Sequence, residues 1–309
     1  MHWMLALFSR NLRRPLVAIT LLIFSSLSAL YLFRIDALAW YFWHNNKHQD
    51  SGEHLKLRDY QVVLDGQAIP GLTDASGLTY NTSTHTLFTV LNQSPYIVEL
   101  SLDGQVLRKI LVEGVGDMEG ITYVADQRFV IADEGDNRLI EAEIPPYATV
   151  VQTRHFPQLK LGLDEDGNQN IEGVSWDSVN QRLLIVKEKN PKRLLEVRGF
   201  IEPLPSNPGH LSIVDLDRSQ RSIGAMRDLS SVTYHDDSGH FLLLSDESRL
   251  IKEYDRQGRA VSAMALWKGF HGLRKHVPQA EGIAVGPDKR IYIISEPNLL
   301  YVFRPIKRT

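Results

Sequence analysis

Cysteine is absent from the 309 residues of this chain, which excludes disulfide bridges, thiolate zinc sites and a cysteine nucleophile. The formal net charge is only −3, and the sequence has no clustered basic face of the kind that binds a nucleic-acid duplex. It also has no glycine-rich phosphate loop and no nucleophile elbow. We therefore expect no nucleic-acid partner, and no common catalytic motif points to a function.

A seven-residue phrase recurs five times. Three copies contain Glu-Gly, at residues 117–123 (Asp-Met-Glu-Gly-Ile-Thr-Tyr), 170–176 and 279–285, and two weaker copies with Ser in place of Glu lie at 74–80 and 228–234. In chain order, the third residues of successive copies are 43, 53, 58 and 51 positions apart. Periods of roughly 40 to 50 residues that contain several short strands are typical of β-propeller blades.

Two further apolar runs follow each phrase. The first of them ends 15 to 17 residues after the third residue of the phrase, always in a polar element: Asn92, Asp133-Glu134, Lys187-Glu188, Asp246-Glu247 or Ser295-Glu296. A fixed inner hairpin with a tolerant outer rim produces this constancy. We therefore predict an all-β fold, a five-bladed β-propeller over residues 60–309. A six-bladed propeller, with a degenerate blade around the apolar run Leu211–Leu216, is the alternative.

The last copy has no room for a fourth strand before Thr309. We expect the apolar run at residues 60–64 to supply that strand, because closing the ring with an N-terminal strand removes the last exposed sheet edge.

The N-terminal part contains Leu16–Phe33, which is 18 residues long and has no charge. A helix that spans a bilayer needs about 17 to 25 predominantly apolar residues. Three arginines lie just before this run and only Arg34 follows it directly. This asymmetry favours an N-terminus inside the cell and a propeller outside.

The expected organisation is a cytoplasmic segment at 1–15, a transmembrane signal-anchor at 16–33, a linker at 34–59 and the propeller from residue 60. The aromatic residues at 40–43 would then form an interfacial belt. A cleaved signal peptide is the competing interpretation, although the apolar run is longer than a usual signal core.

The chain resembles the SdiA-regulated family of bacterial propellers, the YjiK-like proteins. The resemblance runs from about residue 60 to 304 and includes the N-terminal anchor; its most specific stretches are 116–123, 129–134, 186–191, 279–284 and 294–298. It implies a five-bladed propeller distantly related to NHL repeats, with a bound calcium ion. For a bacterial protein, the arginine asymmetry then predicts a propeller on the periplasmic side of the inner membrane. The resemblance implies no settled biochemical activity.

Glu119, Glu172 and Glu281 are the candidate metal ligands. The innermost strands of a propeller line one channel, so these carboxylates from three blades should converge at one mouth. Converging carboxylates repel unless a cation neutralises them, and calcium takes six to eight oxygen ligands in flexible geometry. The alternative is a structural role, in which Glu satisfies backbone N–H groups and the following Gly permits close packing of blades.

A second set of residues ends the neighbouring strands at the same mouth. Each acid of this set is either a further metal or pocket residue or a partner in a salt bridge with Arg138, Lys187, Lys189 or Arg249. Lys187 would either bind an anionic group at the mouth or pair with a neighbouring acid. The set is Asp133, Glu134, Lys187, Glu188, Asp246, Glu247 and Glu296.

Two functions remain open at this point. The first is a calcium-stabilised binding propeller that recognises an unknown small molecule or an envelope protein. The second is a calcium-dependent hydrolase of the esterase or lactonase type, an analogy with NHL-related propellers in which the metal acts as a Lewis acid. A spare acid or histidine within about 3 to 5 Å of the metal, facing an open pocket, would favour hydrolysis.

Overall fold

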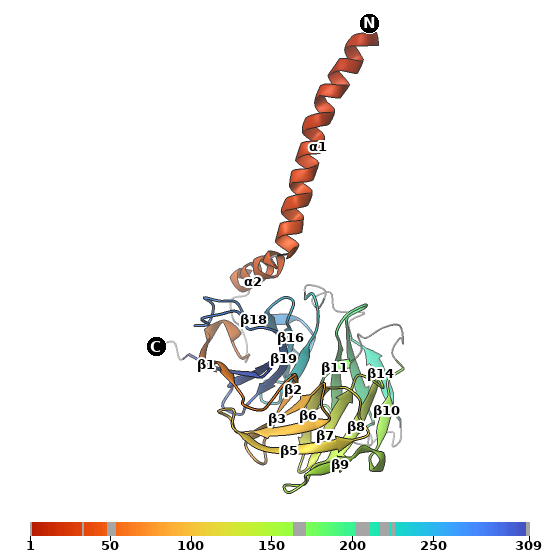
Figure 1. The fold of residues 1–309 in the computed structure, drawn as a ribbon, viewed down its shortest axis with the longest axis vertical. Helices are drawn as coiled ribbons and strands as arrows, with labels where there is room; N and C mark the ends of the chain where they lie inside the picture. The colour runs from red at the N-terminus through yellow and green to blue at the C-terminus, as the bar shows by residue number, and fades with distance from the viewer. Residues whose placement is uncertain are drawn as a thin grey trace.

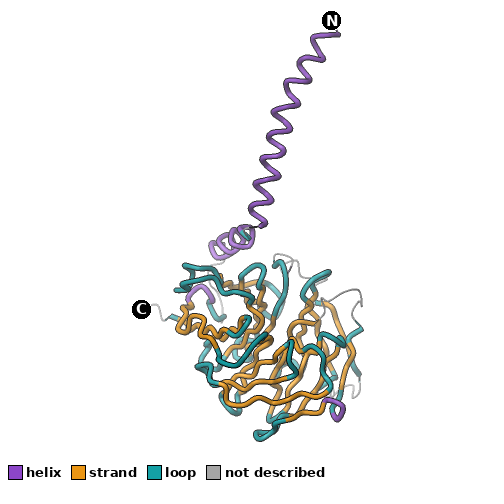
Figure 2. Tube along the Cα trace, viewed as in Figure 1, coloured by secondary structure: helices purple, strands orange, loops and turns teal. Residues whose placement is uncertain are grey.

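Five β-sheets, each with one copy of the repeated phrase on its innermost strand, form a closed ring (Figures 1 and 2). The computed structural model describes residues 2–32, 34–47, 54–162, 171–201, 210–216, 223 and 226–306. The inner strands contact one another in the circular order β2, β6, β11, β15, β19 and back to β2. The predicted five-bladed propeller is confirmed.

The blades consist of the following strands, each sheet given in chain order. Blade 1 has β2 (Ala75–Asn81), β3 (Thr86–Leu91), β4 (Tyr96–Leu100), β5 (Val106–Glu113) and β9 (Val150–Gln152), which is followed by the short helix η2 (Thr153–His155). Blade 2 has β6 (Met118–Ala125), β7 (Arg128–Asp133), β8 (Arg138–Glu143) and β10 (Gln158–Lys160). Blade 3 has β11 (Ile171–Asp177), β12 (Arg182–Lys187), β13 (Arg193–Arg198) and β14 (Ser212–Asp215). Blade 4 has β15 (Ser231–His235), β16 (His240–Ser245), β17 (Leu250–Tyr254) and β18 (Ala260–Ala265). Blade 5 has β1 (Tyr60–Ala68), β19 (Ala280–Val285), β20 (Ile291–Ser295) and β21 (Leu299–Pro305).

The ring is closed by the N-terminal strand, as expected. β1 pairs antiparallel with β21, from Tyr60 opposite Pro305 to Ala68 opposite Leu299. The six-bladed alternative is wrong, because the apolar run at 211–216 contains β14, which is the outermost strand of blade 3. An unexpected strand, β9, extends blade 1 by pairing in parallel with β5.

The core is divided into five apolar layers, one between each pair of adjacent blades. The layer between blades 1 and 2, for example, packs Phe88 and Val90 against Phe129 and Ile131. Each sheet is therefore buried on both faces. This explains why the second run of each repeat is continuously apolar instead of alternating.

Two helices precede the propeller, α1 (His2–Leu32) and α2 (Ile35–Lys47). Helix α2 packs on β18 of blade 4, where Ala37 and Tyr41 are buried. The segment expected to be a polar linker over 34–59 thus contains a docked helix and the short helix η1 (Leu57–Asp59); residues 48–53 lie outside the described residues.

The structure differs from the single straight membrane span expected at 16–33. No helix among the described residues is by itself long and apolar enough to cross a membrane. The segments Val17–Leu32 and Ile35–His44 meet that requirement only as a pair, bent by 76°. The structure therefore offers a bent pair in place of one straight span over 16–33.

Candidate functional site

The three candidate glutamates occupy equivalent β-bulges at the start of three inner strands. In β6, Met118 pairs with Asp133 and Gly120 with Ala132, which leaves Glu119 as the extra residue. Glu172 and Glu281 are likewise skipped in the registers of β11 and β19. A bulge re-aims the side chain of its extra residue, so the repeated phrase directs one carboxylate per copy out of the regular ladder.

Glycine follows each of these glutamates because the next blade approaches closely. A Cβ atom on Gly120 would lie 3.1 Å from the backbone nitrogen of Val174, and one on Gly282 would lie 2.6 Å from the backbone carbon of Gly77. Real Cβ atoms are not accommodated at the second of these distances without a shift of the backbone. The packing role expected for the glycines is therefore confirmed.

The three glutamates act on one another electrostatically. Burial, followed by the negative charges of Asp117 and Glu134, raises the pKa of Glu119 to about 8. Burial, followed by the charge of Glu119, raises the pKa of Glu172 well above its ordinary value. The structure thus gathers carboxyl groups from different blades at one mouth of the channel, which we call the acidic mouth.

Glu281 completes this arrangement from blade 5. Burial, and then the charges of Asp246, Glu296 and Glu119, raises its pKa to about 9. Carboxyl groups in this state are protonated near neutral pH unless a cation is present to favour their ionised form.

The tightest acidic cluster at this mouth is Asp117, Glu119 and Glu134. Each offers a carboxylate oxygen, and the three oxygens lie within 4.8 Å of one another. Glu119 is only 8% exposed. Among the described residues these are the carboxylates that could hold a metal ion. Sequence reasoning missed Asp117, although it is the first residue of the same repeated phrase, two positions before Glu119.

Asp133 has a different task from its neighbour Glu134. It is fully buried and receives hydrogen bonds from Arg138, Nε at 2.8 Å and NH2 at 2.6 Å. It also accepts from the backbone N–H of Asp117 at 3.2 Å. Asp133 therefore positions the segment that carries Asp117. Its salt bridge with Arg138 is the alternative to metal binding that the sequence analysis gave for this residue.

Asn92 places an uncharged amide group beside the cluster. Its side chain reaches Glu119, and its Nδ2 donates to Glu296 at 3.4 Å. Its Oδ1 is buried and accepts no hydrogen bond from any residue that the structure describes. A buried carbonyl oxygen in that state calls for a donor or a cation.

The two blades without glutamate use serine at the same position to join neighbouring blades. Ser76 donates to the carbonyl of Glu119 at 3.1 Å, and Ser230 donates to the carbonyl of Ala280 at 2.7 Å. The ring of side chains is therefore asymmetric, with carboxylates in blades 2, 3 and 5.

Lysines lie beside the other acids of the second set. Lys189 contacts Glu188 at 2.6 Å and Glu247 at 2.9 Å, and so links blades 3 and 4. Lys187 is buried, and its Nζ donates to the carbonyl of Lys189 at 2.7 Å.

Asp246 and Glu296 lie near the edge of the mouth. Asp246 faces Arg34 at 4.0 Å, and Glu296 accepts from Gln279 at 3.0 Å. A further acid that the sequence reasoning missed, Asp228, is buried, and burial raises its pKa to about 6. Asp228 is the first residue of the fourth copy of the repeated phrase, at 228–234, and this position in the repeat could have identified it.

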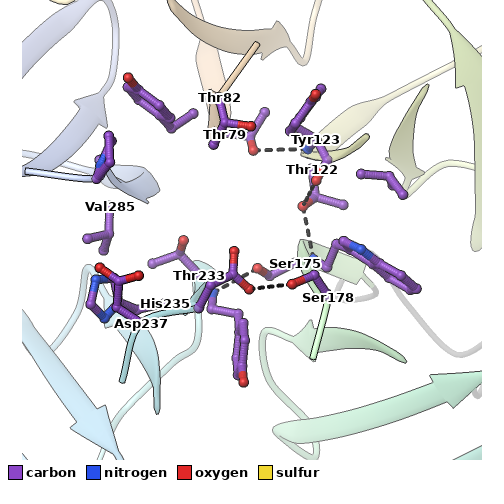
Figure 3. Close-up of a pocket in the computed structure, with 17 residues that line it drawn as sticks. Thr79, Thr82, Thr122, Tyr123, Ser175, Ser178, Thr233, His235, Asp237 and Val285 are labelled. Carbon is purple, nitrogen blue, oxygen red and sulfur yellow. Dashed lines mark hydrogen bonds between the residues drawn. The ribbon is translucent and has the colours of Figure 1, made fainter. Parts of the chain in front are cut away.

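The opposite mouth of the channel is a pocket of about 220 Å³ formed by the C-terminal ends of the inner strands. Figure 3 shows hydroxyl groups arranged around it and hydrogen bonds from blade to blade. In three of these bonds a hydroxyl accepts from the backbone N–H of the next blade: Tyr123 to Thr79 at 3.0 Å, Trp176 to Thr122 at 2.9 Å and Tyr234 to Ser175 at 2.8 Å. The sixth residue of the phrase therefore joins the blades at this end.

Comparison with known proteins agrees with this architecture. The SdiA-regulated family profile matches residues 53–304. The calcium-binding protein regucalcin from Agrobacterium tumefaciens aligns at 14% identity with a TM-score of 0.50, over 81% of this chain and 97% of that one. A streptogramin B lyase aligns at 10% identity with a TM-score of 0.45, over 81% and 99%. Because the family profile covers most of its length, the chain belongs to the SdiA-regulated family.

Proposed function

We propose that this protein is a membrane-anchored β-propeller that binds calcium at its acidic mouth and there recognises a small molecule or an envelope protein. The observation that carries the proposal is the convergence of Asp117, Glu119 and Glu134 within 4.8 Å. Oxygen-only donor sets of this kind suit calcium. The calcium named for regucalcin supports this choice of ion; the ligands are inferred from this chain alone.

The residues that would hold the ion are Asp117, Glu119 and Glu134, with Asn92 Oδ1 as a neutral oxygen. Glu172 and Glu281 contribute negative charge from blades 3 and 5, since both interact electrostatically with Glu119. The raised pKa values of Glu119, Glu172 and Glu281 apply to the site without a bound cation. Binding of a divalent ion would stabilise their ionised forms and release protons.

For location, we propose that α1 anchors the chain in the bacterial inner membrane and that the propeller lies on the periplasmic side. The support is the uncharged run at 16–33 and the arginines that precede it. Reporter fusions after Arg304 test the orientation: a reporter active only in the cytoplasm should be inactive there.

A hydrolase is the second candidate, and the acids outside the cluster favour it. When bound, calcium would polarise an ester or lactone carbonyl as a Lewis acid. Glu172 and Glu281 are additional half-buried carboxyl groups that interact with Glu119, and raised pKa values suit proton transfer near neutral pH.

Calcium binding is tested by isothermal titration calorimetry of the detergent-solubilised full chain after treatment with a chelator. We expect binding in the wild type and a loss of at least tenfold in affinity for Asp117→Asn. Asp126→Asn is the matched control, because Asp126 is exposed in the turn between β6 and β7 at the opposite end of the same strand. Equal affinity in all three proteins would exclude Asp117 from the site.

An assay of hydrolytic activity then distinguishes the binding protein from the hydrolase. The same preparation is assayed against a panel of esters and lactones with calcium and with chelator. Calcium-dependent turnover that is lost in Glu172→Gln, with calcium binding retained, would establish the hydrolase. Calcium binding without turnover on any substrate of the panel would favour the binding role.

A further inference from the structure

Helix α2 has one face on the propeller. Ala37 and Tyr41 are buried in an apolar cluster with Leu250, Ala263 and Ala265 of blade 4. The Tyr41 ring meets the Phe270 ring edge-on at 5.7 Å between centroids. This face of the helix is therefore part of the propeller's packing.

The opposite face of α2 is also apolar, yet it is exposed. Ile35 is 41%, Phe42 50% and Trp43 53% exposed, and Ala39 between them is exposed as well. Positions 35, 39, 42 and 43 follow the spacing of one helical stripe. Helix α2 thus presents apolar side chains on the side turned away from blade 4, with the ring of Phe42 at the edge of this side, 5.8 Å from the Phe270 ring.

The apolar side chains of α1, which precedes this stripe, are exposed as well. The side chains of Leu22, Phe24 and Tyr31 are 69%, 70% and 62% exposed, and the two helices meet at a bend of 76°. A helix perpendicular to a bilayer that bends by this angle would leave the second helix nearly parallel to the membrane surface. Helices with aromatic and aliphatic residues on one face lie in that interfacial layer.

Cations gather around the junction of the two helices. Arg34 donates to the backbone carbonyl of Asp246 at 3.0 Å, and Arg249 lies over the ring of Trp267 at 5.0 Å. The backbone N–H of Lys268 donates to Nδ1 of His276 at 3.1 Å. Burial, and then the charges of Arg249, Lys268 and Arg34, lowers the pKa of His276, so these cations are close enough to act on one residue.

Helix α2 lies on β18, the outermost strand of blade 4. At its start, Arg34 contacts Asp246 at the acidic mouth. After it, His54 and Lys56 line a cavity with Ser238 and Lys289, which belong to the opposite mouth. Figure 1 shows α2 next to β18 and α1 extending from α2 away from the propeller.

We propose that the stripe Ile35, Ala39, Phe42 and Trp43, together with the cations around Arg34, seats the propeller edge-on against a bilayer that contains anionic phospholipids. The occupant of this surface is lipid, because the stripe follows the apolar α1 and is flanked by positive charge. Both mouths of the channel then open sideways along the membrane, and neither is pressed against it. This inference rests on the proposed anchoring by α1.

The absence of cysteine makes the test direct, because a single introduced cysteine carries the only label. Full-length Trp43→Cys and Ile35→Cys variants receive a nitroxide and are reconstituted into vesicles of phosphatidylcholine and phosphatidylglycerol. Tyr147→Cys is the aqueous control, since Tyr147 is 95% exposed in the loop after β8, and Leu22→Cys reports on the anchor. Power saturation compares the accessibility of each label to oxygen and to a water-soluble nickel chelate.

We expect the labels at 35 and 43 to be several-fold less accessible to nickel than the label at 147, with the label at 22 the least accessible. Nickel accessibility at 35 and 43 equal to that at 147, with 22 still protected, would overturn the interfacial seat while leaving the anchor intact. A label at 22 as accessible as that at 147 would overturn both. If the stripe binds a partner protein instead of lipid, the labels at 35 and 43 should be as accessible to nickel as the label at 147, because these vesicles contain no other protein.

The role of charge is tested with the same labels. Replacing phosphatidylglycerol by phosphatidylcholine, or introducing Lys268→Gln, should increase nickel accessibility at position 43, because both changes weaken attraction of cations to the surface. Unchanged accessibility under both changes would remove the anionic headgroups from the proposal.

Discussion

The ammonium nitrogen of Lys252 lies 3.4 Å from the centre of the Trp40 ring. Lys252 is fully buried on β17, and its Nζ has no hydrogen-bond partner among the described residues. The face of an aromatic ring attracts a desolvated cation by about 2 kcal/mol or more. One buried charge on the propeller is therefore covered by the helix that leads to the N-terminal apolar segment.

Replacing Trp40 by leucine should destabilise the protein by about 2 to 4 kcal/mol, because the substitution removes aromatic packing and leaves a buried ammonium without its ring. Chemical denaturation of the detergent-solubilised chain measures this. Lys252→Met should recover part of the loss in the Trp40→Leu background. Strict additivity of the two substitutions would contradict coupling between the residues.

Stability should rise with pH between about 7 and 10 through Lys252. Burial, with a smaller contribution from Lys192, lowers the pKa of Lys252 to about 7, whereas an unfolded lysine titrates near 10.4. In this window the unfolded chain binds more protons than the folded one, so the unfolding free energy increases with pH, by up to about 1.4 kcal/mol per unit. The measurement is the unfolding free energy of wild type minus that of Lys252→Met across the window. A constant difference would mean that the Trp40 ring keeps Lys252 charged throughout.

Gly282→Ala should destabilise the propeller by at least about 1 to 3 kcal/mol, since the new Cβ would lie 2.5 Å from Ile294 Cγ2 and 2.6 Å from the backbone of Gly77. Gly116→Ala is the control, because a Cβ atom on Gly116 would have no neighbouring atom within 4 Å. The melting temperatures of the two variants provide the comparison. Similar melting of both would show that blades 1 and 5 are not in close contact at the acidic mouth.

The five copies of the phrase predicted the blades and the closing strand because propeller packing repeats locally, and each copy contains the same apolar runs at nearly constant spacing. The convergence of Glu119, Glu172 and Glu281 followed from the place of the phrase at the start of each inner strand. The bulges that re-aim these glutamates were not predictable, since a bulge depends on the register with the neighbouring strand.

Other features depend on contacts between residues far apart in the chain. Asp133 and Glu134 are adjacent, yet Asp133 pairs with Arg138 while Glu134 joins Asp117 and Glu119. Sequence alone does not separate two such neighbours. The docking of helix α2 was not predictable for the same reason. Its four aromatic residues were expected to form an interfacial belt. Two of them pack on the propeller instead: Trp40 faces the buried Lys252 of blade 4, and Tyr41 faces Phe270 in the loop after it.

The central claim is that the acidic mouth binds calcium in the folded state. A ligand that binds only the folded state stabilises it by RT ln(1 + [L]/Kd), about 2.7 kcal/mol at a hundredfold excess over Kd. The most direct measurement is the melting temperature of the solubilised chain in chelator and in saturating calcium, for wild type, Glu119→Gln and Glu143→Gln, the last an exposed residue at the end of β8. We predict a calcium-induced increase in wild type and in Glu143→Gln and a much smaller one in Glu119→Gln; equal increases in all three, or none in wild type, would contradict the account.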